Sequence, residues 1–298
     1  MRNINTYQIS NLFGIRDILN ISPVNTGHIN RTYLVEDRNG KYILQSLNRK
    51  VFSNPEKVMN NIKKIEQAFR ESGDVTVPYY LTAHGKSFIE TNGEVWRVYE
   101  YTEQSELTEN RDYMTGYAFG KFINVMNGKN IVLETTIENF HDFDRYHDRY
   151  MKLSGAKCPD SLKKIIAEVF TPDLPRRNVH NDAKSDNIIF GEKVTIIDLD
   201  TAMKGFVAVD YGDMIRSGRD IENITKGFSD GLGGILTREE INSLYYGILY
   251  VTGELAFRYA LDSLSEERYF ITKTPEQCKR RAEELMSQFD YFEKNSII

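Results

Sequence analysis

The chain has 298 residues, with 38 Lys and Arg against 43 Asp and Glu, and so carries a net charge of −5. Its length fits one large domain or two lobes with a substantial core, and its mildly acidic balance gives no electrostatic reason to expect nucleic acid or an anionic membrane as a partner. Because it has no apolar leader, no run of roughly 18 apolar residues and no CxxC pair, we expect a cytoplasmic protein without a membrane segment.

The first hundred residues predict mainly β-strands. Runs near 20–25, 30–36 and 41–47 have strand character, and they are separated by Asn25-Thr26-Gly27 and by Asn39-Gly40. Residues of these types favour tight turns. Three successive strands joined by short connections are therefore expected.

A helix is expected to begin at about Asn54. Ser53 is placed to cap it, Glu56 to complete a capping box, and Pro55 to occupy the first turn. Apolar residues then recur at helical spacing as far as Phe69.

A hairpin is expected over 87–101, because Asn92-Gly93 is typical of tight β-hairpin turns. After Tyr101 a short polar segment reads as a linker, and longer helical patterns begin. We therefore expect an α+β chain with a small β-rich lobe, 1–101, and a larger, mostly helical lobe, 102–298.

Helical patterns dominate the second lobe. One helix is expected over roughly 109–127, and capping boxes open two more, one at Thr237 and one at Thr274. The helix after Thr237 carries one apolar stripe. That stripe comprises Leu244, Ile248, Val251, Leu255 and Tyr259.

The stretch 179–200, VHNDAKSDNIIFGEKVTIIDLD, gathers acids around two short apolar runs. His180, Asp182 and Asn187 within it have the spacing of the kinase catalytic loop, H-x-D-x-x-x-x-N. In that arrangement the Asp faces the substrate hydroxyl, while the Asn faces a metal on the nucleotide phosphates. Lys184, two residues after the Asp, is placed to reach a transferring phosphoryl group.

The two apolar runs predict a second hairpin. Residues 188–190 and 194–197 form its arms, with a turn at Gly191-Glu192. Such a hairpin returns Asp198 to the side of Asn187. Oxygen ligands of this kind suit Mg²⁺, so this pair is a candidate metal site.

The chain resembles the aminoglycoside and choline kinases, the small-molecule relatives of the protein kinases. Among their branches it is most similar to the N-acetylhexosamine 1-kinases, through NTGHINRTY, YILQSLN, HNDAKSDNIIF, IDLDTAMKG and DYGDMIRSG. The resemblance covers nearly the whole chain. It implies a bilobed, protein-kinase-like fold with ATP in the cleft between the lobes.

The resemblance also implies roles for single residues. Asp182 is the implied catalytic base, assisted by Lys184, and Asn187 and Asp198 are the implied Mg²⁺ ligands. Adenine is expected against the backbone of Glu100, Tyr101 and Thr102. The other expected nucleotide contacts are Thr26, Gly27, Asn30 and Gln45.

The sequence departs from the kinase pattern in several places. Asp198-Leu199-Asp200 replaces Asp-Phe-Gly, no Ala-Pro-Glu follows, and there is no GxGxxG, which argues against a protein kinase with an activation loop. Gln45 stands where a phosphate-binding Lys is expected, and a neutral amide cannot supply that charge. Either another Lys or Arg does so, or the nucleotide is held differently. Glu66 and Glu56 are candidates for the helix acid that normally pairs with that Lys.

Substrate contacts are expected from the first hairpin, the catalytic loop and the helices of the second lobe. The candidates are His28, Asp182, Asp200, Arg216, Arg258 and Tyr269. Structural alternatives remain for most of them: His28 and Asn30 can belong to a simple turn, and Asp200 can bind a second metal or cap a turn.

Arg216 and Arg258 are cations in apolar helical contexts, so each needs a partner. That partner is either a sugar hydroxyl or an internal carboxylate. His180 is expected to hold the catalytic loop, and Asp210 and Asp213 to brace it.

The expected function is ATP- and Mg²⁺-dependent phosphorylation of the anomeric hydroxyl of an N-acetylhexosamine, N-acetylglucosamine or N-acetylgalactosamine. Two rivals remain. One is a related kinase that acts on choline, homoserine, methylthioribose or an aminoglycoside, and the other is a nucleotide-binding pseudokinase, which Gln45 alone favours. The preferred hexosamine and the oligomeric state are not indicated by the sequence.

Overall fold

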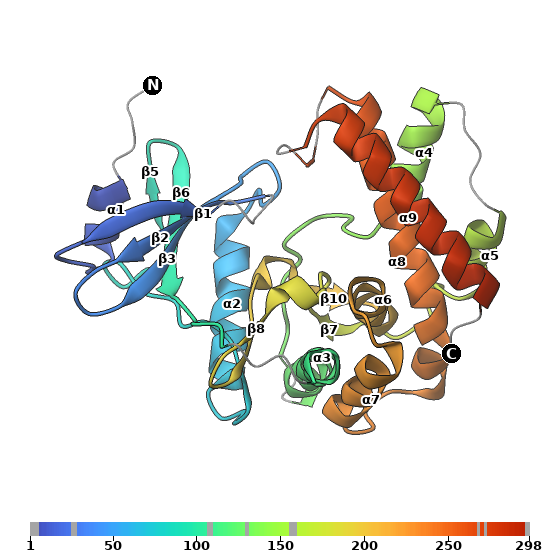
Figure 1. Cartoon of the computed structure of the whole chain (residues 1–298), viewed down its shortest axis with the longest axis horizontal. Coiled ribbons are helices and arrows are strands. Elements are labelled where there is room, and N and C mark those ends of the chain that lie inside the picture. The colour runs from blue at the N-terminus through green and yellow to red at the C-terminus, as the bar shows by residue number, and fades with distance from the viewer. Residues whose placement is uncertain are drawn as a thin grey trace.

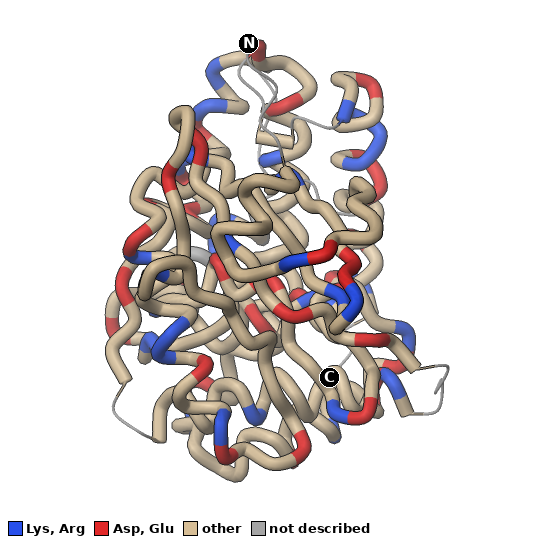
Figure 2. Tube along the Cα trace, turned by 90° about the vertical axis from the view of Figure 1, so that its left-hand side faces the viewer, with Lys and Arg blue, Asp and Glu red and all other residues tan. Residues whose placement is uncertain are grey.

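The structure is a computed structural model that describes residues 6–24, 29–105, 110–128, 131–154, 160–266, 269–270 and 273–295. Two lobes lie side by side (Figure 1): a twisted sheet with one long helix, and a larger body of helices. The predicted α+β, bilobed architecture is confirmed. In the second view, acidic and basic residues are interspersed along the trace (Figure 2).

A five-stranded antiparallel sheet forms the first lobe, in the order β1-β2-β3-β6-β5. Its strands are β1 (Asn20–Val24), β2 (Arg31–Glu36), β3 (Lys41–Leu47), β5 (Ile89–Thr91) and β6 (Glu94–Glu100). The three predicted strands and the predicted hairpin are all present. Asn92 and Gly93 both have positive φ, 51° and 79°, as a type I′ turn requires. The predicted turn at Asn25-Thr26-Gly27 lies outside the described residues.

A short helix, α1 (Thr6–Leu12), precedes the sheet and was not predicted. Ile9 and nearby Phe13 and Ile15 are buried with Leu44 and Trp96 of the sheet in a separate apolar cluster. This cluster covers the sheet face that points away from the helical lobe. It gives the first lobe a small apolar core of its own.

The long helix of the first lobe, α2 (Pro55–Phe69), stands between the sheet and the helical lobe (Figure 1). Its cap is Asn54, whose side chain accepts the N–H of Lys57 at 3.2 Å. The prediction of a Ser53 cap with Glu56 in a capping box was therefore wrong by one residue. Proline is favoured at the first helical position, and Pro55 at that position leaves Asn54 as the cap.

A small three-stranded sheet joins the two parts of the sequence. Strand β4 (Val75–Thr76) pairs in parallel with β9 (Val194–Ile196), which pairs with β8 (Ile188–Phe190). The predicted second hairpin is thus present. Since β4 lies before residue 101 in the chain and β9 after it, the division at 101/102 stays a prediction.

The helical lobe contains α3 (Arg111–Gly128), α4 (Phe143–Ser154), α5 (Asp160–Glu168), α6 (Val207–Ser217), α7 (Ile221–Leu232), α8 (Arg238–Leu264) and α9 (Pro275–Asn295). Both predicted capping boxes are formed: Thr237 exchanges two bonds with Glu240, and Thr274 exchanges two with Gln277. No helix in the described part of the chain is long and apolar enough to cross a membrane.

Helix α8 is buried on more than one side. Ile248 and Val251 of the predicted stripe are buried, but so are Leu249, Tyr250 and Phe257 from other positions. A helix enclosed by neighbours on several sides has apolar residues around its circumference. The single stripe was therefore too narrow a prediction.

Helices α3 and α7 cross at very close range because glycines line the contact. A Cβ at Gly116 would collide with the carbonyl oxygen of Ile224, and one at Gly227 with that of Tyr113. This crossing lies beneath the strands that carry the candidate site.

We expect Gly116→Ala to destabilise the protein by about 1–3 kcal/mol, because the backbones must separate to admit a methyl group. Gly128→Ala, in the same helix, is the control: its Cβ meets no described atom within 4 Å. Urea unfolding measures both. Equal stability of the two variants would show that the crossing is not tightly packed.

Candidate active site

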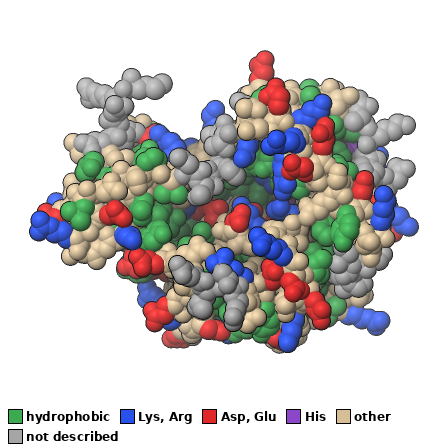
Figure 3. Space-filling model, in the orientation of Figure 1, with side chains coloured by type: hydrophobic (Ala, Val, Ile, Leu, Met, Phe, Trp, Pro, Cys, Tyr) green, Lys and Arg blue, Asp and Glu red, His purple; other side chains and the backbone are tan. Residues whose placement is uncertain are grey.

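A cleft of about 1690 Å³ separates the two lobes and contains most of the predicted site residues. Its lining includes Gln45 and Glu100 from the sheet lobe and Asp182, Asp198 and Arg258 from the helical lobe. The space-filling view shows the hollow, with charged side chains at its rim (Figure 3).

The catalytic loop, residues 180–187, follows β7 (Arg177–Val179), which pairs with β10 (Met203–Gly205). The backbone N–H groups of His180 and Asn181 donate to the two carboxylate oxygens of Asp210, both at 2.7 Å. Asp210 thus holds the start of the loop from α6, as expected from the sequence. Burial raises the pKa of Asp210 to about 7, although these two bonds oppose the shift.

His180 lies behind the loop and away from the cleft. Its Nε2 is 3.0 Å from the carbonyl oxygen of Ile197, and its ring packs edge-on against Phe119 and Phe122. Burial lowers the pKa of His180. This placement agrees with the structural role expected for this residue.

Asp182, Lys184 and Asn187 form a compact hydrogen-bonded group. Lys184 Nζ lies 2.7 Å from Asp182 Oδ2, and Asn187 Nδ2 donates to the same oxygen at 3.0 Å and to the Asp182 carbonyl at 2.8 Å. Burial favours the neutral acid, but Lys184 outweighs it and lowers the pKa of Asp182 to about 2. Asp182 is therefore ionised over the physiological pH range.

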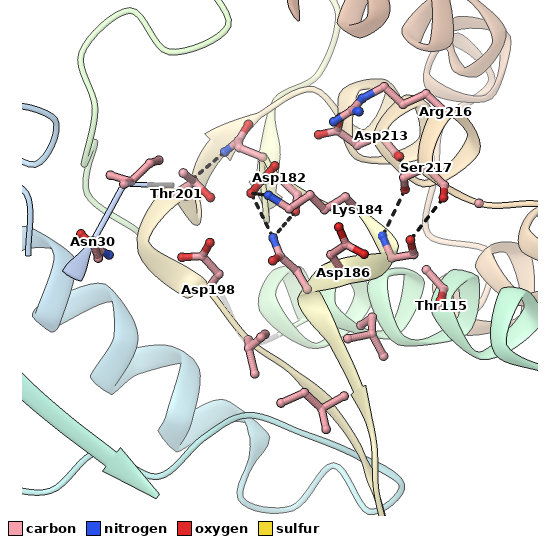
Figure 4. A pocket seen from close by; sticks show the side chains of 18 of the residues that line it. Asn30, Thr115, Asp182, Lys184, Asp186, Asp198, Thr201, Asp213, Arg216 and Ser217 are labelled. Atoms are coloured by element: carbon pink, nitrogen blue, oxygen red, sulfur yellow. Dashed lines mark hydrogen bonds and ion pairs between the residues drawn. The ribbon is translucent and has the colours of Figure 1, made fainter. Parts of the chain in front are cut away.

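Asp198 faces the same space from the other arm of the site (Figure 4). The Ile197 N–H donates to the Asn187 carbonyl at 2.9 Å, so the hairpin returns Asp198 beside Asn187 as predicted. Asp198 has a positive φ of 59°, a conformation that Asp tolerates better than most residues. Its side chain stays accessible from the cleft.

The surroundings of Asp198 fit a divalent cation. Burial, Asp200 and Asp182 raise the pKa of Asp198 to about 7, so the carboxylate is held among like charges. The Nδ2 of Asn187 makes both bonds to Asp182, which turns the amide oxygen away from Asp182 and leaves it available. A carboxylate and an amide oxygen form a donor set that suits Mg²⁺. The metal role of both residues stays a prediction.

On the sheet side of the cleft, Gln45 is hydrogen-bonded to a buried arginine, Arg97. Its amide oxygen accepts from Nε and Nη2 of Arg97, at 3.1 and 2.7 Å, and its amide nitrogen donates to Thr32 at 3.1 Å. Arg97 in turn forms a two-bond ion pair with Asp200, at 2.5 and 2.9 Å. The side chains of Arg97 and Asp200 are each only 1% exposed.

The Arg97 pair changes the expected role of Asp200. Asn30 Nδ2 also donates to Asp200 at 2.9 Å, so the carboxylate is enclosed by protein groups, and Asp200 does not line the cleft. The geometry gives Asp200 a structural partner in place of the predicted substrate contact. Asn30 lines the cleft, but its side chain is engaged by Asp200 and by the N–H of Asn48.

The acid that pairs with the buried cation is thus Asp200, and neither Glu66 nor Glu56. Glu66 is only half-buried and accepts the backbone N–H of Tyr80; burial raises its pKa. Glu56 is exposed in the first turn of α2. The expected helix acid was wrong because the cation comes from β6, and the nearest carboxylate to it lies in the 199–201 turn.

The residues predicted to contact adenine, Glu100, Tyr101 and Thr102, all line the cleft where the chain passes between the lobes. The Glu100 N–H donates to Tyr79 and the Tyr101 N–H donates to Lys41, both at 3.0 Å. The backbone of Thr102 has no such bond within the described part of the chain. Thr26, Gly27 and His28, also predicted contacts, lie outside the described residues.

Arg216 lines the cleft beside the catalytic loop but is paired internally. Its Nε and Nη2 both lie 2.6 Å from Asp213 Oδ1. Of the two partners left open by the sequence, the internal carboxylate is the one present. The Asp213 carboxylate is taken by Arg216 and makes no hydrogen bond to the described residues of the loop, so only Asp210 of the two predicted bracing acids holds the loop through its carboxylate.

Arg258 lies at the back of a recess that opens into the cleft. Four rings surround its guanidinium, and we call this group the aromatic recess: Phe140, Tyr146, Tyr269 and Phe270, with Tyr269 nearest at 4.6 Å. Burial opposes the charge of Arg258, but Glu254 and, less strongly, Asp182 raise its pKa. The recess is therefore close to the catalytic loop.

Two residues of the recess, His141 and Glu254, were not predicted. Glu254 is fully buried, 3.6 Å from both His141 Nδ1 and Arg258 Nη1. The other ring nitrogen of His141 donates to the carbonyl oxygen of Asn181 at 2.8 Å. Burial opposes its charge, but Glu254 raises the pKa of His141, while Arg258 and His141 hold the pKa of Glu254 below its usual value against burial.

Several polar atoms in the recess lack a hydrogen-bond partner among the described residues. These atoms are both carboxylate oxygens of Glu254, Nδ1 of His141 and Nε of Arg258. Buried polar atoms in folded proteins are nearly always satisfied. Glu254 Oε2 and His141 Nδ1 nonetheless face each other as an ion pair at 3.6 Å, so Glu254 Oε1 and Arg258 Nε are the two atoms of this group without a partner among the described residues.

Residues 20–239 match the phosphotransferase enzyme family, APH. The chain belongs to this family. Solved structures with the same fold include a choline/ethanolamine kinase family protein from Mesorhizobium loti, at 13% identity, TM-score 0.68, covering 96% of this chain and 94% of that one. A microcompartment-associated aminopropanol kinase matches at 17% identity and TM-score 0.64, covering 95% and 98%.

A third similar structure is a spectinomycin phosphotransferase in complex with ADP and spectinomycin, at 14% identity and TM-score 0.62, covering 96% and 99% of the two chains. Identities this low show a shared fold alone. Beside the 180–187 loop and Asp198, this chain carries Arg97 on β6 opposite the neutral Gln45.

The residues that sequence reasoning missed had weak local signals. Arg97 interrupts an apolar strand, EVWRVYE, and Glu254 lies four residues before Arg258 on one helix. Both are charges in apolar segments, which demand partners. His141 gives no comparable signal, because its position depends on a loop between α3 and α4.

We expect Asp210→Asn to loosen the catalytic loop. An asparagine offers one oxygen and one N–H₂ group, so one of the two backbone N–H groups would face another donor, at a cost of about 1–3 kcal/mol. Amide hydrogen exchange over 177–187 is then expected to accelerate by roughly tenfold or more.

Asp37→Asn is the matched control. The Oδ1 of Asp37 accepts two backbone N–H groups, from Asn39 and Gly40, in the β2–β3 turn far from the loop. Unchanged exchange over 177–187 in Asp210→Asn would mean that the carboxylate does not hold the loop.

Proposed function

We propose that this member of the phosphotransferase enzyme family is an ATP- and Mg²⁺-dependent kinase that phosphorylates the anomeric hydroxyl of an N-acetylhexosamine. The observation that carries the proposal is the aromatic recess, whose Arg258 and Glu254 lie in the same cleft as the ionised Asp182. The product would be a sugar 1-phosphate.

The chemistry of the recess favours a neutral molecule with several hydroxyl or amide groups. Arg258 offers a donor and Glu254 offers an acceptor oxygen, while the ring faces suit the apolar face of a sugar. Arg258 in the recess and Arg216 beside the loop disfavour a permanently cationic acceptor such as choline, which is bound best by aromatic rings without a competing cation.

Asp182 is the proposed base. It would orient the acceptor hydroxyl and accept its proton as the phosphoryl group leaves ATP. An anomeric hydroxyl is more acidic than an ordinary alcohol, so a carboxylate of low pKa suffices. Phosphoryl transfer depends mainly on positioning and electrostatics, so few protein groups are needed.

The ammonium group of Lys184 can bind either Asp182 or the transferring phosphoryl group. In this structure it pairs with Asp182, and a phosphate would compete for the same ammonium group. Turning toward the transferring phosphoryl group would let Lys184 stabilise its negative charge and would free Asp182 Oδ2 for the acceptor. Asn187 and Asp198 would hold Mg²⁺, which when bound neutralises charge on the nucleotide phosphates.

On the other side of the cleft, we propose that adenine lies against the backbone of Glu100–Thr102, with Thr102 supplying an unused N–H. Spectinomycin phosphotransferase, which has the same fold, has been crystallised with ADP, and this supports nucleotide binding in the shared cleft. The phosphates would then lie near Asn30. Thr26 and Gly27, the other proposed nucleotide contacts, and His28, a proposed substrate contact, lie outside the described residues.

One observation favours a second acceptor class. A buried, ionised Glu254 can attract an amine, and an aminopropanol kinase and a choline/ethanolamine kinase family protein share this fold. Arg258 and His141 face the same carboxylate, however, so its charge is already offset.

The proposal is tested by measuring ATP consumption with Mg²⁺ and N-acetylglucosamine, N-acetylgalactosamine, choline, homoserine or kanamycin. We expect turnover with an N-acetylhexosamine and none with its 1-deoxy analogue, which lacks the anomeric hydroxyl. Phosphorus NMR should identify a 1-phosphate. Faster turnover with choline, homoserine or kanamycin would replace this acceptor assignment by another one.

We expect Asp182→Asn to lower turnover by about 100-fold or more, because general-base catalysis and orientation of the acceptor are both lost. ADP affinity should stay within about twofold of the unmodified enzyme. Asp186→Asn, an exposed acid of the same loop, is the control and should retain turnover. Near-normal activity of Asp182→Asn would rule out its role as base.

We expect Asp198→Ala to abolish the strengthening of ADP binding by Mg²⁺, because one of the two proposed metal ligands is gone. Calorimetric titration with ADP, in Mg²⁺ and in a chelator, measures this strengthening. Asp186→Ala serves as the control variant. If Mg²⁺ strengthens ADP binding equally in Asp198→Ala, the metal ligand lies elsewhere.

A further inference from the structure

We propose that Arg97 supplies the cation missing at Gln45, and that it acts as a positioning residue which ties the Asp198–Asp200 turn to the sheet of the first lobe. This inference rests on the proposed metal role of Asp198. It places the cation of this part of the sheet on β6 and gives it a positioning task, which differs from the phosphate binding expected of a lysine on β3.

The register of the sheet places the two residues together. Gln45 and Arg97 are directly opposite each other on β3 and β6, so their side chains project from the same face. Moving the cation from β3 to β6 shifts it by one strand, about 4.8 Å, without moving it out of the cleft wall.

The guanidinium is held in one orientation. Thr32 accepts from the Gln45 amide nitrogen, which directs the amide oxygen toward Arg97, and that oxygen accepts two bonds from Arg97. The ring of Tyr80 lies 5.5 Å away and the sulfur of Met59 3.9 Å away. The neutral amide of Gln45 therefore accepts hydrogen bonds from Arg97, whereas a lysine at position 45 would repel the guanidinium.

The other edge of the guanidinium points into the helical lobe. Both of its terminal nitrogens bind Asp200, which lies in the 199–201 turn two residues after Asp198. Asn30, just before β2, donates to the same carboxylate. The turn is thus bonded to two parts of the first lobe, at the point where the chain presents Asp198 to the cleft.

A further hydrogen bond holds the C-terminal end of this turn, at Ala202. Asn61 of α2 donates to the carbonyl oxygen of Ala202 at 3.0 Å. Asp198 is therefore presented by a segment anchored to β6 at Asp200 and to α2 at Ala202. Removing the Arg97 anchor is expected to disturb the position of Asp198 without removing any ligand atom.

The experiment compares ADP binding by calorimetry with Mg²⁺ and with a chelator in the full chain. For Arg97→Gln we expect Mg²⁺-dependent binding to weaken about tenfold or more, as when the outer partner of a metal ligand is lost. Binding of metal-free ADP should change by less than about twofold, because Arg97 acts through Asp200 and does not touch the phosphates.

A double variant that moves the positive charge from β6 back to β3 tests whether Mg²⁺-dependent ADP binding can be restored. In the double variant Gln45→Lys/Arg97→Gln the cation returns to β3 on the same face, and we expect much of the Mg²⁺ effect to return. Arg97→Lys keeps the charge but not the two-bond geometry, and should show an intermediate loss. Arg31→Gln is the matched control, since Arg31 is an exposed arginine on β2 of the same sheet that pairs with Glu94.

Each result decides the matter. Full Mg²⁺ dependence in Arg97→Gln overturns the inference, and an equal loss for metal-free ADP overturns it in favour of direct phosphate contact. If Arg97→Gln does not fold, Arg97→Lys with unchanged Mg²⁺ dependence overturns it. If the unmodified protein itself shows no strengthening by Mg²⁺, the proposed metal role of Asp198 fails, and this inference falls with it.

Discussion

The pairing of buried charge organises this cleft. Three acids in the cleft or its wall have a basic partner: the part-exposed Asp182 with Lys184 at 2.7 Å, the buried Asp200 with Arg97 at 2.5 Å and the buried Asp213 with Arg216 at 2.6 Å. An unpaired buried carboxylate is costly, whereas a paired one is tolerated. Asp198 has no such partner among the described residues and stays exposed to the cleft, while partial desolvation and its acidic neighbours raise its pKa to about 7.

The same pairing explains how two lobes of different architecture stay in register. Arg97 comes from a sheet and Asp200 from a turn of the helical lobe, 103 residues later. The parallel β4–β9 pair and the Asn61–Ala202 bond cross the same boundary. These links reach the second arm of the β8–β9 hairpin and the turn that follows it, so the placement of Asp198 depends on contacts between the lobes.

In the aromatic recess around Arg258, charges are balanced but hydrogen bonds are not complete. In the aromatic recess the charges of Arg258, Glu254 and His141 offset one another, yet their hydrogen-bonding atoms are not fully used. His141 links the recess to the loop through the Asn181 carbonyl. The recess is therefore linked through one hydrogen bond to the backbone next to Asp182.

The sequence by itself determined the strands of the first lobe, several of the helices and the spacing within the site, but not α1 or α4 to α7. Capping boxes, the Asn92-Gly93 turn and the spacing from His180 to Asn187 are local patterns, and local chemistry decides them: a cap needs its own first turn, and a hairpin needs its own turn residues. The Ser53 cap failed by one residue because Pro55 moved the helix start.

Only the tertiary structure decided the partners. Arg97 finds Asp200 through the β3–β6 register and the packing of the two lobes, and Glu254 meets His141 through a loop more than a hundred residues earlier. The sequence showed that Arg216 and Arg258 needed partners but not which ones. A pairing between distant residues is set by the whole fold, because it depends on how sheets, helices and loops pack and not on neighbours in the chain.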